Sequence, residues 1–203
     1  SGYQDVDYVL TTREFGRMLR QAGVNFSVLA DSEFDNPLGM STGAGAIFGA
    51  TGGVMEAALR TVYEVVTGKE LQKLEFESVR GLEGVKEATV DLDGLPVKVA
   101  VAHGLGNARK IMEKIKDGTA DYTFVEVMAC PGGCIGGGGQ PYLTRKETRM
   151  ARMDAIYEVD AHMPLRKSHE NPAVQQLYKD FLKEPLGEMS HHLLHTHYTK
   201  RGL

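Results

Sequence analysis

The feature that most constrains this chain is a glycine-rich turn at residues 124–141, FVEVMACPGGCIGGGGQP, which contains both of its cysteines. Cys130 and Cys134 stand four positions apart, where an apolar run ends and before four consecutive glycines, Gly136–Gly139. The Pro-Gly-Gly between the cysteines disfavours a continuous helix, because proline and glycine are poor helix interior. We interpret this turn as the metal end of the molecule.

Two thiolates on one turn gather negative charge, and an iron–sulfur cluster would add more. Such a site needs inward-pointing backbone N–H groups and little side-chain bulk. The nearby glycines Gly132, Gly133 and Gly136–Gly139 suit both needs. Two alternatives stay open, a disulfide between the cysteines and a pair of structural thiols. In a reducing compartment, a close cysteine pair more often marks metal or redox chemistry.

Zinc competes with iron–sulfur as the metal. His191 and His195, one helical turn apart in the tail HHLLHTHY, would complete a Cys2His2 set with the two cysteines. The usual zinc-finger spacing is absent, however, and histidines at a helix end are more often structural. Iron–sulfur is therefore favoured, although a cubane takes four cysteines and this chain contains two. The remaining ligands would come from another polypeptide or from a missing part of this one.

Composition limits the class of protein that surrounds this turn. The 203 residues are 42% hydrophobic with a formal net charge of −4, which suits one substantial globular core. No basic cluster with interleaved aromatic residues indicates nucleic acid as a partner. No apolar run approaches the ~20 residues of a membrane span, and no export pattern opens the chain. We therefore expect no nucleic-acid partner, no membrane span and a cytoplasmic location.

Hydrophobic spacing and turn residues predict the secondary structure. Helices are expected over the ranges 12–22, 54–65 with a stop at Gly68, 106–117, 145–158, 172–183 and 188–197. The first of them begins with the N-cap signal of Thr11, Thr12 and Glu14. Strands are expected at 24–29, in a hairpin over 85–101 that reverses at Asp93-Gly94, and at 122–128 as a buried strand.

A second glycine-rich stretch, GAGAIFGATGG at 43–53, opens the helix that starts at Val54. Glycines before a helix commonly hold phosphate, but this stretch has no Gly-Lys-Ser/Thr ending and no dinucleotide pattern. We expect instead that these glycines allow close backbone packing around something bulky.

The order of elements predicts the fold class. Strand, helix and strand precede the cysteines, so the metal turn stands at the carboxyl end of a strand, where α/β sheets commonly bind ligands. We predict an α/β fold with a mixed β-sheet flanked by helices and a C-terminal helical tail. The expected division is an α/β lobe over 1–144 and a helical tail over 145–203.

The segment EVMACPGGCIGGGGQP, Glu126–Pro141, resembles the third signature of the [FeFe]-hydrogenases. Other stretches are similar to the same enzymes, so the resemblance covers essentially the whole chain. They are DVDYVLTTREF (5–15), FDNPLG (34–39), IFGATGGVMEAALR (47–60) and HHLLHTHY (191–198). The last portion, from about Arg145, resembles what some family members carry as a separate small subunit.

The resemblance implies a cofactor and roles for named residues. In that family the H-cluster is a [4Fe-4S] cubane joined through a cysteine sulfur to a two-iron centre with CO, cyanide and an azadithiolate bridge, and it interconverts protons and H2. Cys130 would ligate the cubane, and Cys134 would ligate it and bridge to the two-iron centre. Met128 would stand beside the two-iron centre, so Cys134 and Met128 are the catalytic candidates.

Three further residues, Phe48, Gly49 and Val54, would line the two-iron pocket in this resemblance. The cluster would then be the bulky object around which the second glycine-rich stretch packs. For Phe48 and Val54, ordinary core packing stays an equally open interpretation.

The chain also departs from the family, because its first two signatures have no counterpart here. Those signatures carry the other two cubane cysteines and the cysteine that exchanges protons with the bridging amine. The resemblance therefore implies the C-terminal part of a catalytic subunit, starting just after the second signature and inactive alone. Its expected partners are the N-terminal part of that subunit, ferredoxin-like or NAD(P)-linked electron-transfer modules, and H2 and protons.

Two other functions stay open at this point. One is a hydrogenase-like protein of cytosolic iron–sulfur assembly, which would be a carrier and not an enzyme. The other is a zinc-stabilised interaction domain.

Overall fold

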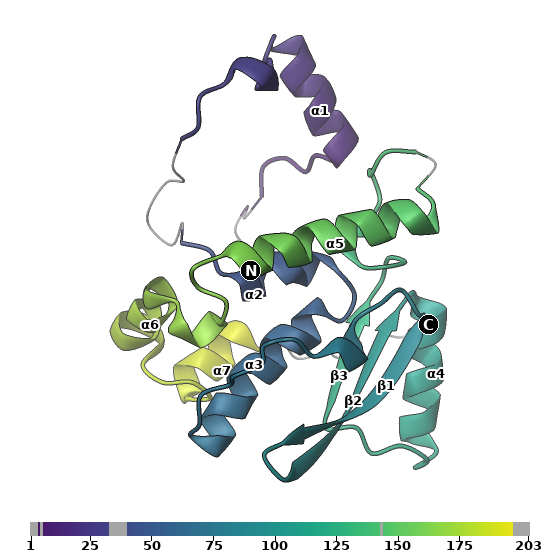
Figure 1. Ribbon diagram of the computed structural model, residues 1–203, viewed down its shortest axis with the longest axis vertical. Helices are drawn as coiled ribbons and strands as arrows, with labels where there is room; N and C mark the ends of the chain where they lie inside the picture. The colour runs from purple at the N-terminus through teal and green to yellow at the C-terminus, as the bar shows by residue number, and fades with distance from the viewer. Residues whose placement is uncertain (1–3, 5, 33–39, 143, 197–203) are drawn as a thin grey trace.

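A three-stranded sheet lies between two helices and carries the two cysteines on the turn at residues 130–140, called here the cysteine turn (Figure 1). The structure is a computed structural model and describes residues 4, 6–32, 40–142 and 144–196. Its mixed sheet, flanking helices and C-terminal helices confirm the predicted α/β fold class.

The sheet has the order β1-β2-β3. β1 (Val85–Leu92) and β2 (Leu95–His103) pair antiparallel from Val85↔Ala102 to Leu92↔Leu95. Asp93 and Gly94 both have positive φ, 57° and 89°, which is the backbone that a tight two-residue hairpin requires. The predicted hairpin is therefore confirmed. β3 (Phe124–Met128) pairs parallel with β2 and ends two residues before Cys130.

Helices cover both faces of the sheet. Alternate side chains of β2 point to opposite faces, so this strand contacts a helix on each side. On one face, Val99 and Val101 pack with α3 (Gly53–Thr67) in a buried cluster. On the other face, Ala100 and Ala102 pack with Ile111 of α4 (Leu105–Lys116). The small alanines face α4 and the larger valines face α3, so each helix has its own complementary surface.

The remaining helices lie close to their predicted ranges, apart from two short ones within 43–49 that were not predicted. They are α1 (Thr12–Gln21), α2 (Gly43–Ala46), the 3-10 helix Ile47–Gly49, α5 (Lys146–His162), α6 (Pro172–Leu177) with the π-helical turn Tyr178–Leu182, and α7 (Glu188–Leu194). The Thr11 and Glu14 side chains form the predicted capping box of α1. Among the described residues, no helix is both long enough and apolar enough to cross a membrane.

Two strand predictions were wrong in part. Residues 24–29 contain a 3-10 helix, Phe26–Val28, in which the Asn25 side chain accepts a hydrogen bond from the Ser27 N–H. β-Branched and aromatic residues favour a strand only where a neighbouring strand pairs with them. The strand at 124–128 exists but is not buried, because it forms an edge of the sheet and leaves Phe124 42% exposed.

The second glycine-rich stretch is partly helical, and its close contacts are with the protein itself. A Cβ on Gly43 would overlap the carboxylate of Asp160, one on Gly52 the carbonyl of Val79, and one on Gly53 that of Ile47. Glycine is thus required at these positions by α5, by a neighbouring loop and by the preceding turn. At these three positions the close neighbours are other residues of this chain, and not a bound group.

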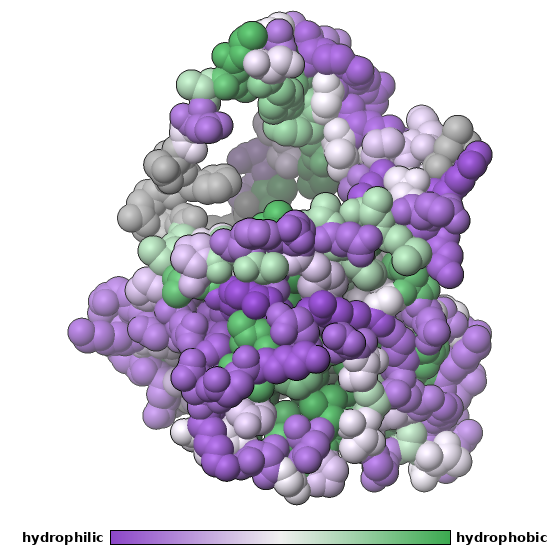
Figure 2. All heavy atoms as spheres, in the orientation of Figure 1, coloured by the Kyte–Doolittle hydropathy of each residue, from purple (hydrophilic) through white to green (hydrophobic). Residues whose placement is uncertain are grey.

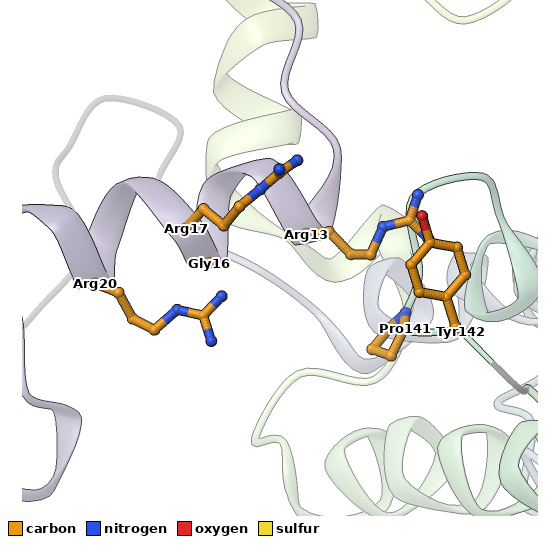
Figure 3. Close-up of a pocket in the computed structure, with 6 residues that line it drawn as sticks. All are labelled: Arg13, Gly16, Arg17, Arg20, Pro141 and Tyr142. Atoms are coloured by element: carbon orange, nitrogen blue, oxygen red, sulfur yellow. The ribbon is translucent and has the colours of Figure 1, made fainter.

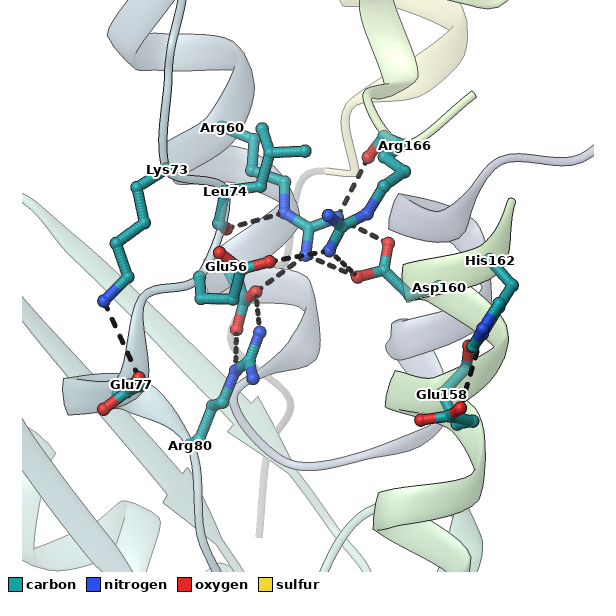
Figure 4. Close-up of polar contacts among 11 residues, drawn as sticks. Glu56, Arg60, Lys73, Leu74, Glu77, Arg80, Glu158, Asp160, His162 and Arg166 are labelled. Atoms are coloured by element: carbon teal, nitrogen blue, oxygen red, sulfur yellow. Dashed lines mark hydrogen bonds and ion pairs between the residues drawn. The ribbon is translucent and has the colours of Figure 1, made fainter. Parts of the chain in front are cut away.

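A network of buried charges joins α3 to α5 (Figure 4). The Arg60 guanidinium donates to Asp160 Oδ1 and Oδ2, at 2.7 and 2.8 Å, and to Glu56 Oε1 at 2.7 Å. All three residues are fully buried. Arg166 and Arg80 add further bonds, to Asp160 at 2.7 Å and to Glu56 at 2.6 Å. Burial raises the pKa of Asp160, but hydrogen bonds from Arg60 and Arg166 outweigh it and hold this pKa below its ordinary value.

Asp160→Asn tests this network. Removing one charge from a buried ion pair leaves its partner uncompensated, so the free energy of unfolding should fall by about 3 kcal/mol. Urea unfolding followed by circular dichroism measures the change. Glu77→Gln is the matched control, since Glu77 forms an exposed ion pair with Lys73 and should cost less than about 0.5 kcal/mol. Equal effects of the two substitutions would contradict a structural role for the network.

Candidate metal centre

The two predicted metal ligands stand directly after β3, on the cysteine turn. Both thiols are free in the structure, so the disulfide alternative is not what the fold forms. Cys130 is partly buried and Cys134 is exposed. A 3-10 helix, Cys134–Gly136, follows the second cysteine. The turn therefore presents one thiol at the protein surface and keeps the other close to the core.

Backbone carbonyls of the cysteine turn are occupied by protein donors. Within the turn, the N–H groups of Gly133, Gly136 and Gly137 donate to the carbonyls of Cys130, Gly133 and Cys134, each at 3.0 Å. From outside the turn, the Thr51 N–H donates to Gly132 O at 3.0 Å and Arg152 Nη1 donates to Ile135 O at 2.7 Å. These bonds fix the shape of the turn. The N–H groups of Gly133, Gly136 and Gly137, which were expected to point at the thiols, are used within the turn.

Gly133 is the tightest point of the turn. Its φ is 93°, and a Cβ there would lie 2.7 Å from Met128 Sδ, 2.8 Å from Thr51 N and 3.0 Å from Gly49 O. Three segments thus meet at one glycine: the end of β3, the stretch before α3 and the cysteine turn. The structure therefore brings the predicted residues Met128 and Gly49 to the turn that carries the cysteines.

Phe48 and Val54 lie in the same region with less definite surroundings. Phe48 is 47% exposed, although it stands next to Gly49, and Val54 is partly buried in the first turn of α3. Their predicted roles, like those of the cysteines and Met128, stay predictions. Residues 34–39, Asp5, His197 and Tyr198, which contributed to the resemblance, lie outside the described residues.

Glu126 is a structural residue of the site that carried no predicted role. It is buried in β3, and its carboxylate accepts hydrogen bonds from Gly52 N at 2.6 Å and Met55 N at 2.7 Å. These N–H groups belong to the start of α3, where a negative charge is favoured by the helix dipole. The one charged residue in the apolar run FVEVM was the available signal. Glu126 fixes the strand that delivers the cysteines against the stretch before α3.

Lys86 is a second buried charge beside this stretch. Its ammonium donates to Gly81 O at 2.7 Å and to Thr51 O at 3.4 Å, and the residue is 7% exposed. Burial lowers the pKa of Lys86 to about 8, although the nearby Glu126 carboxylate opposes the shift. Nothing in the local pattern indicated this buried charge, because Lys86 is simply a polar position in a predicted strand.

The residues present fit part of an iron–sulfur site. Two free thiols on one turn are suitable ligands, and Gly133 leaves no room for a side chain of its own. The Thr51 hydroxyl, fully buried beside this glycine, has no hydrogen-bond partner in the described part of the chain. A buried hydroxyl without a partner is suited to hydrogen-bond a bound group. A cubane needs two more thiolates than the chain contains, so the fit is to half of its ligand set.

The described residues do not assemble the Cys2His2 alternative. His191 and His195 lie together, with ring centroids 4.3 Å apart, but neither forms a group of three or more possible metal ligands with Cys130 or Cys134. The zinc interpretation of these four residues therefore has no support from their placement.

One other group of possible metal ligands, Glu64, His169 and Glu170, lies within 4.8 Å among the described residues. Lys167 Nζ is 2.6 Å from Glu64 Oε1 and 2.9 Å from Glu170 Oε1, so an ammonium already stands between the carboxylates. Partial burial raises the pKa of Glu64, but hydrogen bonds from the Leu71 N–H, Lys167 and His169 outweigh it and lower the pKa to about 2. This group is a satisfied ion-pair cluster that ties α3 to the C-terminal segment.

A pocket of about 560 Å³ lies between α1 and the end of the cysteine turn (Figure 3). Its lining contains neither cysteine and consists of Arg13, Gly16, Arg17, Arg20, Pro141 and Tyr142. The Arg13 guanidinium lies 3.9 Å from the centre of the Tyr142 ring and donates to Gln140 O at 2.9 Å. These contacts attach α1 to the turn.

Family models match nearly all of this chain. Residues 1–138 match the iron only hydrogenase large subunit, C-terminal domain, and residues 146–201 match the iron hydrogenase small subunit. The NADP-reducing hydrogenase subunit HndD of Solidesulfovibrio fructosivorans is 53% identical over 99% of this chain and 34% of its own length. Protein NAR1 of Arabidopsis thaliana is 32% identical over 96% of this chain and 42% of its own length.

Solved structures agree with the family models. The [FeFe]-hydrogenase structure of HydA(deltaEFG), which reveals stepwise H-cluster assembly, has a TM-score of 0.73 and 44% identity. The similarity covers 95% of this chain and 56% of that one. The chain thus spans about a third to two fifths of these curated relatives and little more than half of this solved structure.

Gly133→Ala should destabilise the protein by at least about 3 kcal/mol, because the new Cβ would meet three segments and the backbone has a left-handed φ. Thermal and urea unfolding measure the effect. Gly138→Ala is the matched control on the same turn, since its Cβ would meet nothing within 4 Å, and it should cost less than about 0.5 kcal/mol. A tolerated alanine at Gly133 would contradict the close meeting described here.

Lys86→Met should change how stability depends on pH. Between pH 8 and about 10.5 the unfolded chain holds the Lys86 proton and the folded chain does not, so raising the pH favours folding. The wild-type protein should therefore gain about 3 kcal/mol relative to Lys86→Met over this range. Urea unfolding of both proteins at pH 8 and pH 10.5 checks it. A difference that stays constant with pH would show that the Lys86 pKa is not lowered.

Proposed function

The chain belongs to the iron-only hydrogenase family, and from this membership we propose that it supplies one half of an H-cluster site in an [FeFe]-hydrogenase. The reaction is reversible oxidation of H2 and reduction of protons. The observation that carries the proposal is the pair of free thiols, Cys130 and Cys134, on a glycine-rich turn that Met128 and Gly49 approach closely at Gly133.

The two cysteines are proposed to have different ligand roles. Cys130 ligates the [4Fe-4S] cubane, and Cys134 ligates it and bridges to the two-iron centre with its CO, cyanide and azadithiolate groups. The exposure of Cys134 supports this, because a bridging sulfur must be reachable from two sides. The Met128 side chain lies next to Gly133 of the cysteine turn, and we propose that it stands beside the two-iron centre.

Phe48, Gly49 and Val54 are proposed to line the two-iron pocket. The placement of Gly49 supports its proposed role, since its carbonyl oxygen would lie 3.0 Å from a Cβ on Gly133, next to the cysteines. Exposed Phe48 would become covered when the second half of the site is present. When bound, the two-iron centre supplies an open iron position for H2 chemistry, while the protein residues named here hold and enclose it.

The other half of the site is proposed to come from the N-terminal part of the catalytic subunit. It would provide two cubane cysteines and the acid that delivers the proton. Apolar side chains gather on residues 6–32, called here the N-terminal arm, which stands away from the sheet in Figure 1 and at the top of Figure 2. Tyr8, Val9, Phe26 and Val28 are each at least 70% exposed. Such a surface is suited to burial against another part of the subunit.

Three further proposals concern the protein around the site. Residues 1–144 form the α/β lobe and 145–203 the small-subunit-like tail. Electrons reach the cubane from ferredoxin-like or NAD(P)-linked modules, in keeping with a relative named as an NADP-reducing hydrogenase subunit. The location is cytoplasmic.

A second candidate is a carrier in cytosolic iron–sulfur assembly. The similarity to Protein NAR1, which extends over nearly the whole chain at 32% identity, favours it. The higher identity to HndD favours the enzyme. The two functions differ in whether the iron that Cys134 holds supports H2 production.

Cys134→Ser separates these functions in a complex of this chain with its N-terminal complement, matured with its assembly proteins. H2 evolution from a chemically reduced viologen should fall by more than about 100-fold, because a bridging ligand is lost. Gas chromatography and iron analysis provide the measurements, and Met112→Leu, at an exposed methionine of α4, is the control. An iron-loaded wild-type complex that produces no H2 would favour the carrier, and stoichiometric zinc without iron would overturn both.

A further inference from the structure

Helix α5 packs against the cysteine turn, although it contributes none of the proposed ligands. Residues at helical spacing on one face of α5 contact the cysteine turn and the stretch before α3. Met153 packs with Ala50 and Ile135 in a buried cluster, and Ile156 lies 3.4 Å from the position of a Cβ on Gly49. The C-terminal segment thus reaches both the cysteine turn and the stretch before α3.

A single directional contact from α5 acts on the cysteine turn. Arg152 Nη1 donates to the carbonyl of Ile135 at 2.7 Å, and Ile135 directly follows Cys134. Apolar packing alone would permit this peptide to rotate, whereas a charged hydrogen bond fixes the direction of its carbonyl. The orientation of the Ile135–Gly136 peptide, the second peptide after Cys134, is thereby set from a different element of the chain.

The position of Arg152 is itself fixed. Two helical turns further along the same helix, Asp160 is held by the buried Arg60 guanidinium through two hydrogen bonds. Gly43 allows α5 to approach α2 this closely, since any side chain there would overlap Asp160. The donor therefore stands on a rigid support, which is what a positioning group requires.

We propose that Arg152 is a positioning residue for Cys134. It holds the Ile135–Gly136 peptide inside the turn that the Gly137 N–H closes on the Cys134 carbonyl, so that the thiol keeps its direction. This inference rests on the proposed function of the two cysteines. It assigns to the C-terminal segment a part in the metal site, although both proposed ligands, Cys130 and Cys134, lie outside that segment. Loss of the contact should loosen the Cys134–Gly137 turn without unfolding the sheet.

Hydrogen exchange of the chain alone tests the contact without any metal. Arg152→Met should speed exchange of the Gly136 and Gly137 amides about tenfold, the effect expected for losing a charged hydrogen bond nearby. Arg152→Lys, which keeps a charged donor, should restore part of the protection. Lys146→Met is the control, because Lys146 is an exposed cation at the start of the same helix. Unchanged exchange in Arg152→Met would overturn the inference.

A spectroscopic measurement on the matured complex with the N-terminal complement distinguishes positioning from general stability. Arg152→Met should shift the midpoint potential or the electron paramagnetic resonance g-values of the cubane, with partial return in Arg152→Lys. A merely structural role would lower the amount of signal and leave its position unchanged, and this result would also overturn the inference. If the wild-type complex binds no iron while the exchange effect appears, the proposed function fails and the control of the turn by Arg152 stands.

Discussion

The site depends on one buried carboxylate, that of Glu126. It lies in β3 and accepts two N–H groups from the start of α3, so the strand and the stretch before the helix cannot move independently. This contact places Thr51 and Gly49 against Gly133, and the cysteine turn follows directly. A neutral side chain at this position would leave the helix start without its anion and the two segments without a common anchor.

A second constraint joins the C-terminal segment to the same site. The buried Arg60–Asp160 pair costs desolvation, so its value lies in specifying one arrangement of α5 as much as in stability. With α5 fixed, Arg152 and Met153 both contact Ile135 of the cysteine turn. The part of the chain that matches the small-subunit model therefore packs directly against the cysteine turn, which lies almost wholly in the part that matches the large-subunit model.

Local sequence signals predicted much of the fold. The hairpin at Asp93-Gly94, the capping box of α1 and the glycine-rich cysteine turn each depend on a few adjacent residues, and the structure contains all three. Residues 24–29 were predicted as a strand because their composition suits one, but no neighbouring strand pairs with them in the described residues. Arg152 could not be found this way, since its partner Ile135 lies seventeen positions earlier and only the packing of α5 joins them.

The proposed hydrogenase function requires Cys130 and Cys134 to hold part of an H-cluster. Infrared spectroscopy tests it most directly, on a matured complex of this chain with its N-terminal complement. Bands from iron-bound CO and cyanide are expected, because no other group proposed for the site absorbs there, and they should be lost in Cys134→Ser. A fully iron-loaded complex without these bands would contradict the hydrogenase assignment.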